Sequence, residues 1–272
     1  MDNVELYHYS NKVQKRDAFR CLEEFGKKIK WRNFDKVLDI GCGDGGVTTG
    51  ILKKFIPDNF KHLVGCDISH RMVEFANRHY GDERTSFMVM DIEGQIPRDL
   101  RGAFDHTFSF YTLHWIVDQE AAFTNIYELL GPDGDCLLVF LGNTPLFDVF
   151  RILSRRPKWR PYLKDVERFV SPYHDSQDPE KEIRRMMAKI GFKNIDVQCK
   201  EMCFVYKTMD DVKKAVSAVN PFRMSAELEE EFLEDYIHIV RDMRLIDQVN
   251  NNVDEAVNIR NNYTLLVAFG TK

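Results

Sequence analysis

The chain has 272 residues, of which 44% are hydrophobic and 30% charged. This composition is typical of a globular protein, and the length suits one large domain that carries a substantial insertion. The net charge of −5 at pH 7 excludes the broad basic surface of a nucleic-acid-binding protein, so we expect no nucleic-acid partner. Aromatic residues reach 12%, and they must either fill a core or line an apolar pocket.

The beginning of the chain gives no targeting signal. Residues 1–20 are rich in charged side chains and contain no apolar block, unlike a secretory signal. No segment approaches the roughly 18 apolar residues of a spanning helix, so we expect a cytoplasmic protein without a membrane span. The cysteines show neither a CxxC pair nor zinc-site spacing, which predicts free, mostly buried thiols and no metal site.

Short apolar segments alternate with helix-periodic segments between residues 36 and 141. The pattern predicts strands at 37–40, 63–68, 87–90, 104–110 and 136–141, with helices over 47–55, 70–80 and 122–130 and a turn at 131–134. Ser69 is the expected cap of the second helix. Apolar strands that alternate with helices predict a parallel sheet covered on both faces.

The alternation stops after residue 141. Residues 142–179 are rich in proline and predict an excursion over the sheet. A helix is expected from Pro179 to Gly191, followed by a strand over about 192–205. Two amphipathic helices then flank Asn220-Pro221, and a last strand at 263–269 must return to the sheet. Residues 204–258 therefore predict a helical cap.

A glycine-rich loop, residues 41–46, follows the first strand and opens the first helix. Such a loop lets a ligand approach the backbone and the helix N-terminus. Asp39 ends the strand before the loop, and it would be an awkward neighbour for a pyrophosphate. It suits a ligand with an ammonium and a sulfonium group instead.

Two further acidic residues end the next two strands. Asp67 can accept hydrogen bonds from both hydroxyls of a ribose, and Ile68 offers an apolar shelf for a purine. Asp91, which Ile92 follows, is placed to accept a hydrogen bond from an adenine amino group. For each aspartate taken singly, an ordinary turn residue at a strand end is the alternative interpretation.

This set of residues resembles the class I S-adenosylmethionine-dependent methyltransferases. The resemblance implies an α/β fold with a Rossmann-like seven-stranded sheet, mostly parallel with an antiparallel last strand, plus a helical cap. It implies S-adenosylmethionine as cofactor and S-adenosylhomocysteine as product. The residues expected to bind the cofactor are Arg16, Asp39, Gly41, Cys42, Gly43, Asp67, Ile68, Asp91, Ile92 and Ser109. Among these, Arg16 is expected to reach the methionine carboxylate.

The methyl acceptor is indicated by two other segments. The fourth strand ends in a stretch that contains His114 and Trp115, at the edge where the cofactor's methyl group would lie. The Pro-Pro-Tyr signature typical of N-methyltransferases is missing there, and no metal cluster for catechol-type chemistry is evident. An N-terminal helix places Gln14 on its apolar face, where an amide needs a partner. The alternatives are a structural histidine and a glutamine that reaches water.

With residues 10–18, 64–69, 104–115 and 220–222, the chain is identified as similar to insect juvenile hormone acid O-methyltransferases, particularly the moth type. That family methylates the carboxylate of farnesoic acid or of juvenile hormone acids. The similarity extends over essentially the whole chain. Gly43 and Gly46 make the loop richer in glycine than in some members, which should loosen it without removing a ligand.

The resemblance agrees with the chemistry of the residues. A carboxylate with a pKa of about 4 to 5 is ionised at neutral pH, so no general base is required. Gln14 and His114 are expected to orient it as neutral donors, whereas an arginine clamp would stabilise the ground-state charge that the transition state loses. An isoprenoid chain is expected to contact Trp115, Phe147, Phe150, Trp159, Tyr173 and Phe222.

These interpretations imply one methyltransferase domain, 1–272. Its core is expected at about 31–141, 180–203 and 259–272, with cap and substrate-covering segments at about 1–30, 142–179 and 204–258. A monomer and a homodimer are both compatible with the sequence. The alternatives are a methyltransferase for another fatty or small organic acid, an NAD-dependent oxidoreductase, and a non-catalytic terpenoid-binding protein.

Overall fold

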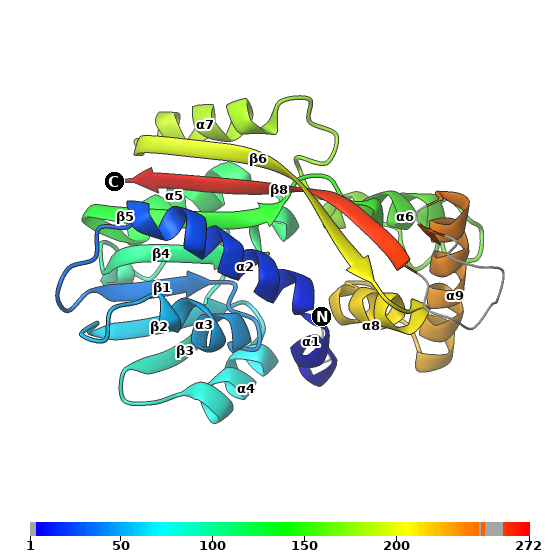
Figure 1. Cartoon of the computed structure of the whole chain (residues 1–272), viewed down its shortest axis with the longest axis horizontal. Coiled ribbons are helices and arrows are strands. Elements are labelled where there is room, and N and C mark those ends of the chain that lie inside the picture. Colours follow the sequence, from blue (N-terminus) through cyan, green and yellow to red (C-terminus); the bar gives the residue numbers. More distant parts are fainter. Residues whose placement is uncertain (1–3, 245, 248–257) are drawn as a thin grey trace.

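The computed structural model describes residues 4–244, 246–247 and 258–272. A mixed β-sheet runs through the molecule, with helices on both of its faces (Figure 1). In the described part of the chain, seven strands follow the order β3-β2-β1-β4-β5-β8-β6, and a two-residue strand, β7, pairs with β8 beside this order. The strands are β1 Lys36–Ile40, β2 His62–Asp67, β3 Thr85–Val89, β4 Phe104–Phe110, β5 Leu130–Leu141, β6 Lys193–Tyr206, β7 Ile246–Asp247 and β8 Asn258–Thr271.

The strand directions confirm the expected topology. Strands β1 to β5 pair in parallel, whereas β8 is antiparallel to both of its neighbours, β5 and β6. The sheet is therefore mostly parallel with an antiparallel last strand. The carboxyl ends of β1, β2 and β4 consequently meet at one edge, where open α/β sheets bind their ligands.

The helices follow the apolar patterns of the sequence. Ser69 accepts a hydrogen bond from the backbone N–H of Met72 and caps the helix that follows. Pro179 begins another helix, which ends at Gly191 with a φ of 119°. The helices are α1 Val4–Ser10, α2 Lys12–Phe25, α3 Gly46–Gly50, α4 His70–Tyr80, α5 Gln119–Leu129, α6 Pro145–Ser154, α7 Pro179–Ile190, α8 Met209–Val219 and α9 Ala226–Asp242.

Two predicted elements differ from the observed ones. The helix expected over 47–55 ends at Gly50, because Ile51 leaves the helical conformation with a φ of −125°, and a 3₁₀ turn at Leu52–Lys54 follows. Glycine weakens a helix interior through its backbone freedom. The turn expected at 131–134 lies within β5, where the register with β4 shifts between the pairs Phe104–Leu130 and His106–Asp135.

Separate apolar clusters fill the two faces of the sheet. Residues of α2, such as Leu22 and Phe25, cover one face, and residues of α5 and α7, such as Phe123 and Met187, cover the other. Helices α6, α8 and α9 gather at the carboxyl edge and contribute to a third cluster (Figure 1). Of the expected cap, residues 245 and 248–257 lie outside the described residues. No helix in the described ranges is long and apolar enough to cross a membrane.

Candidate active site

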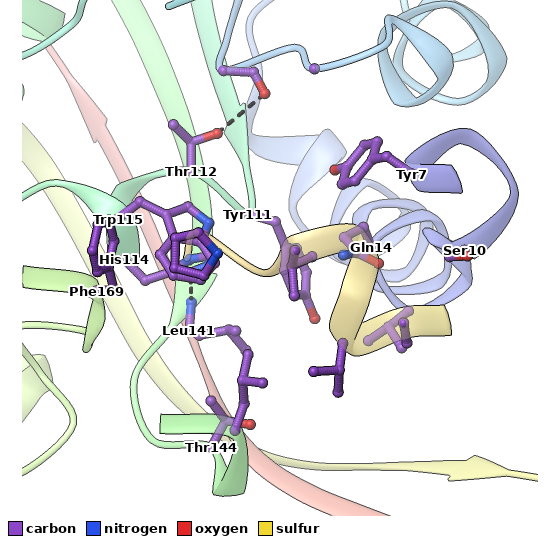
Figure 2. A pocket seen from close by; sticks show the side chains of 18 of the residues that line it. Tyr7, Ser10, Gln14, Tyr111, Thr112, His114, Trp115, Leu141, Thr144 and Phe169 are labelled. Carbon is purple, nitrogen blue, oxygen red and sulfur yellow. Dashed lines mark hydrogen bonds between the residues drawn. The ribbon is translucent and has the colours of Figure 1, made fainter. Parts of the chain in front are cut away.

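A cavity of about 600 Å³ opens at the carboxyl edge of the sheet. Its lining includes the glycine loop and residues that follow β2 and β3. Residues of α2, of the 3₁₀ turn Leu113–Trp115 and of α8 also contribute to the lining. Figure 2 labels ten of these side chains, among them Gln14, His114 and Trp115. The cavity thus brings together six of the residues expected at the cofactor with Gln14, His114 and Trp115, which were expected at the acceptor.

The glycine loop makes a tight turn at the end of β1. The backbone N–H groups of Gly41 and Cys42 both donate to the carbonyl of Cys66, at 2.7 and 2.9 Å. Gly41 has a φ of 71°, and a Cβ atom there would lie 1.9 Å from Oγ1 of Thr112. Only glycine fits this position, and the turn exposes Gly41 and Gly43 to the cavity.

Asp67 lines the cavity directly behind this loop. Its Oδ2 accepts the N–H of Gly43 at 3.0 Å, and its Oδ1 accepts the N–H of Ser69 at 2.9 Å. Burial raises the pKa of this carboxyl, while the two backbone donors lower it. Each oxygen keeps further acceptor capacity for a ligand with paired hydroxyls. The neighbouring side chain of Ile68 is 67% exposed and lines the cavity as an apolar surface.

Asp91 and Ile92 line the same cavity after the end of β3. Asp91 accepts the N–H of Glu93 at 2.9 Å and stays exposed, whereas Ile92 is buried. The structure therefore brings Gly41, Gly43, Asp67, Ile68, Asp91 and Ile92 to one surface. This surface has apolar side chains for a flat ring and carboxylates for hydroxyl or amino donors.

Four residues expected at the cofactor do not line this cavity, and two of them, Asp39 and Cys42, are buried side chains before and within the loop. Asp39 is 2% exposed and accepts a hydrogen bond of 2.6 Å from Oγ1 of Thr48. Burial raises its pKa to about 7. Cys42 is buried as well, and its pKa is raised for the same reason. Asp39 therefore binds Thr48 of α3, and the thiol of Cys42 points into the protein interior.

Ser109 and Arg16 are engaged elsewhere. Oγ of Ser109 donates to the carbonyl of Ile40 at 2.9 Å and ties β4 to β1. Arg16 donates to Asp17 at 2.8 Å, to the carbonyl of Cys203 at 2.9 Å and to the phenol of Tyr263 at 2.5 Å. The guanidinium of Arg16 is therefore bound to protein groups, and the expectation that it reaches a cofactor carboxylate finds no support.

His114 lies in the 3₁₀ turn Leu113–Trp115 and is 2% exposed. Nδ1 of its ring accepts the backbone N–H of Leu141 at 3.3 Å (Figure 2). Burial lowers the pKa of His114 to about 3, so the ring is neutral and its proton is on Nε2. Trp115 also lines the cavity, with its ring centroid 4.8 Å from that of His114.

Gln14 lines the cavity from α2. Its Oε1 is buried and has no hydrogen-bond partner in the described part of the protein. An amide oxygen accepts hydrogen bonds, so an ionised carboxylate cannot satisfy this atom, and only Nε2 of Gln14 could donate to one. Figure 2 shows Gln14 and His114 on either side of the Tyr111 ring.

Of the six aromatic residues expected to contact an acceptor chain, Trp115 lines the cavity and the other five do not. Phe147 packs behind the lining, with its ring 5.9 Å from Trp115. Phe150, Trp159 and Phe222 belong to the apolar cluster among the cap helices, and the phenol of Tyr173 donates to Gln119. All five side chains are buried. Their size predicts burial, but it does not predict which side of a helix or loop they occupy.

Other side chains line the apolar part of the cavity. The lining there is aliphatic, with additional aromatic rings, and includes Leu146, Phe169, Val212, Val216, Val219 and Val240. Three of these valines form the apolar face of α8, which the helical periodicity of the sequence already indicated. The positions of Tyr7, Tyr111 and Tyr263 in the lining had no sequence signal.

The comparisons with known proteins agree with this geometry. A family model described as a methyltransferase domain matches residues 37–134. Juvenile hormone acid O-methyltransferase from Bombyx mori is 56% identical, with 100% of this chain and 98% of the relative covered. The Drosophila melanogaster enzyme of the same name is 41% identical, covering 100% and 93%. Malonyl-[acyl-carrier protein] O-methyltransferase 1 from Ilyobacter polytropus is 33% identical over 70% and 66%.

Solved structures show the same fold. The YcgJ protein from Bacillus subtilis superposes with a TM-score of 0.59 at 20% identity, covering 93% of this chain and 98% of that one. Phosphoethanolamine N-methyltransferase 2 from Haemonchus contortus, solved with S-adenosyl-L-methionine, gives 0.57 at 17% identity, covering 99% and 56%. From the full-length similarity to the two insect enzymes, the chain belongs to the juvenile hormone acid O-methyltransferase family.

Proposed function

We propose that this protein is an S-adenosylmethionine-dependent carboxyl O-methyltransferase that converts farnesoic acid or juvenile hormone acids to their methyl esters. The names of the two insect relatives support the acceptor class. One structural observation carries the proposal furthest: the neutral His114 and the amide of Gln14 line the same cavity as Asp67.

The residues at the carboxyl edge fit the cofactor. Asp67 is held by two backbone N–H groups and has capacity for the ribose hydroxyls, while Ile68 and Ile92 offer apolar surface to the adenine. Asp91 can accept from the adenine amino group. The loop at Gly41 and Gly43 gives the methionine part close access to the backbone. When bound, S-adenosylmethionine supplies an electrophilic methyl group on a positively charged sulfur.

The acceptor side of the cavity fits a carboxylate that is already ionised. With a pKa of about 3, His114 is a poor base at neutral pH, but its Nε2–H can donate a hydrogen bond. Nε2 of Gln14 can donate a second one. Two neutral donors would orient the carboxylate so that one oxygen lies about 3 Å from the methyl carbon. The charge of the carboxylate disappears during transfer, so neutral donors avoid stabilising the ground state excessively.

The rest of the cavity fits an apolar chain. Leu146, Phe169 and the valines of α8 present apolar side chains, and the lining also includes Arg168 and Arg260. Burial of such a chain supplies binding energy of roughly 25 cal/mol per Å² of apolar surface. The cap helices contribute this apolar lining. We therefore also propose that the single domain consists of a core that contains the sheet and a cap that covers the acceptor.

The alternatives differ in what they require of the site. Membership of an O-methyltransferase family disfavours hydride transfer by a nicotinamide cofactor and a role limited to terpenoid binding. Another fatty or small organic acid as natural acceptor stays open as a competing substrate class. Titration with S-adenosylhomocysteine and with NADH separates a methyltransferase from a nicotinamide-dependent oxidoreductase directly.

Steady-state kinetics of Gln14→Ala and His114→Ala with farnesoic acid test the proposal. Each substitution should lower kcat/KM by about 10- to 100-fold, since each removes a hydrogen-bond donor that orients the carboxylate. Gln95→Ala and His238→Ala change the same residue types at exposed positions and should leave kcat/KM unchanged. An unchanged kcat/KM in both site variants would refute the assigned roles.

A further inference from the structure

Tyr111 has an unusual backbone conformation for a large side chain. It follows β4 directly and has a φ of 62°, in the left-handed region that favours glycine and asparagine. Strained residues of this kind persist only where their surroundings hold them, and they cluster at functional sites. The contacts of Tyr111 with its surroundings must therefore stabilise this conformation.

The strained turn connects the sheet to both parts of the cavity. The backbone N–H of Tyr111 donates to the carbonyl of Val139 at 2.7 Å, so the turn begins on the sheet. The next residue, Thr112, donates from Oγ1 to the carbonyl of Gly41 at 3.2 Å. The chain then enters the 3₁₀ turn that contains His114. Tyr111 alone thus separates β4 from the contact of Thr112 with the glycine loop, and three residues separate β4 from His114.

The side chain of Tyr111 is anchored to α2. Its phenol donates to Oδ2 of Asp17 at 2.6 Å, and Asp17 is fully buried. Asp17 also accepts from Nε of Arg16 at 2.8 Å and from the phenol of Tyr263. Burial raises the pKa of Tyr111 well above its ordinary value, so the phenol keeps its proton and stays a donor. Hydrogen bonds to a buried carboxylate are among the stronger ones in proteins.

The ring of Tyr111 lies between the two proposed donors to the acceptor. It lines the cavity, and its plane is perpendicular to that of His114 at a centroid distance of 5.9 Å. Figure 2 shows it between Gln14 and His114. Gln14 and Asp17 lie three residues apart on α2, nearly one helical turn. The phenol therefore binds the same helix that presents Gln14, while the ring contacts the turn that presents His114.

We propose that Tyr111, anchored by Asp17, is a positioning residue that sets the separation between Gln14 and His114. The inference rests on the proposed function, because the separation matters for the carboxylate that the two residues would bind together. A hydrogen bond of Tyr111 to Asp17 fixes α2 relative to the 3₁₀ turn, and the strained backbone is retained for this purpose.

The variant Tyr111→Phe tests this role with little change in packing, because it keeps the ring and removes only the phenol oxygen. We expect kcat for farnesoic acid to fall by about 10- to 100-fold, as misplaced reacting groups lose rate steeply. The Kd of S-adenosylhomocysteine should stay within about twofold, since neither Gly41 nor Asp67 loses a contact. Tyr127→Phe is the matched control, because Tyr127 is half-buried on α5 and does not line the cavity.

A double-mutant cycle tests the anchor. Asp17→Asn and Tyr111→Phe should each lower kcat, and the double variant should lose less than the sum of the two single losses, because both variants disturb the hydrogen bond between Tyr111 and Asp17. Additive losses would overturn the claim that Tyr111 acts through Asp17. An unchanged kcat for Tyr111→Phe, with or without a lower Tm, would overturn the positioning role itself.

A measurement without turnover separates failure of this inference from failure of the proposed function. If the wild type methylates none of the tested acids, the proposed function is wrong, and the imidazole ¹⁵N and ¹H resonances of His114 in the complex with S-adenosylhomocysteine decide the inference. Tyr111→Phe should shift these resonances relative to the wild type, while Tyr127→Phe should not. Identical resonances in Tyr111→Phe and the wild type would contradict the inference.

Discussion

The backbone N–H of Leu141 donates to Nδ1 of His114 at 3.3 Å, and this contact determines which ring nitrogen has the proton. Leu141 is the last residue of β5, so the sheet itself orients the imidazole. The proton is consequently on Nε2, and burial keeps the ring neutral. His114 is thus a fixed, neutral hydrogen-bond donor. A histidine that acts as a catalytic base would need a higher pKa.

This contact predicts how His114 affects stability as the pH changes. The pKa of His114 is about 3 in the folded protein, against its ordinary 6.5 in the unfolded chain. The unfolded chain therefore binds the proton first, and stability is lost as the pH falls from 6.5 towards 3. Between pH 7.5 and 5, the wild type should lose about 2 kcal/mol more unfolding free energy than His114→Gln. Equal losses in urea unfolding would contradict the buried neutral state.

His106 should have the opposite pH dependence. Its ring bonds to Asp35 at 2.8 Å and to Asp135 at 2.7 Å. Burial lowers the pKa of His106, but the hydrogen bonds and charges of Asp135 and Asp35 outweigh it, so the pKa is raised overall. The stabilisation is present below the ordinary pKa of 6.5 and is lost as the pH rises through the raised value.

His106→Gln checks that sign. It should cost about 3 kcal/mol of unfolding free energy at pH 6, because it breaks a buried charged cluster, and less at pH 9. Urea unfolding at both values measures the difference, and His62→Gln, a half-buried residue of β2, serves as the comparison. A larger cost at pH 9 than at pH 6 would show that the imidazole is not charged in the folded protein.

Asp67 should control cofactor affinity. Asp67→Ala removes the acceptor proposed for both ribose hydroxyls and releases the N–H groups of Gly43 and Ser69. The Kd of S-adenosylhomocysteine in calorimetry should rise by about 10- to 100-fold, as expected for hydrogen bonds to a charged group. Asp58→Ala, at an exposed loop position, should bind like the wild type. Wild-type affinity in Asp67→Ala would exclude this residue from the cofactor site.

Two glycines of the same segment should respond differently to alanine. Gly41→Ala places a Cβ 1.9 Å from Thr112 at a φ of 71°, so it should lower both Tm and cofactor affinity. Gly50→Ala, in α3 with open space around the added atom, should raise unfolding free energy by about 0.5 kcal/mol or leave it unchanged. Equal effects of the two substitutions in thermal unfolding would contradict the steric argument.

The sequence predicted those site residues whose place follows from the topology. Asp67, Asp91 and His114 follow strand ends, and parallel strands bring such ends to one edge. Gln14 followed from the apolar face of a helix that must cover the sheet. In each case the regular geometry of an element determines the direction of the residue.

The residues whose observed positions differ from the expected ones depend on partners far away in the chain. Arg16 binds Tyr263, 247 positions later, and no local pattern shows this contact. Phe150 and Trp159 both pack against Phe232 in the cap, so their size indicates burial without indicating the cavity. Tyr111 adopts a left-handed backbone although it is neither glycine nor asparagine, so its residue type does not predict this conformation. A hydrogen bond to Asp17 compensates for the strain.

The central claim is that this protein transfers a methyl group to an isoprenoid carboxylate, and one measurement tests it most directly. Purified protein is incubated with methyl-labelled S-adenosylmethionine and, in parallel, with farnesoic acid, a juvenile hormone acid or a medium-chain fatty acid. We predict labelled methyl ester from the isoprenoid acids, with one S-adenosylhomocysteine formed per ester. Absence of ester from both isoprenoid acids, under conditions in which S-adenosylhomocysteine binds, would contradict the account.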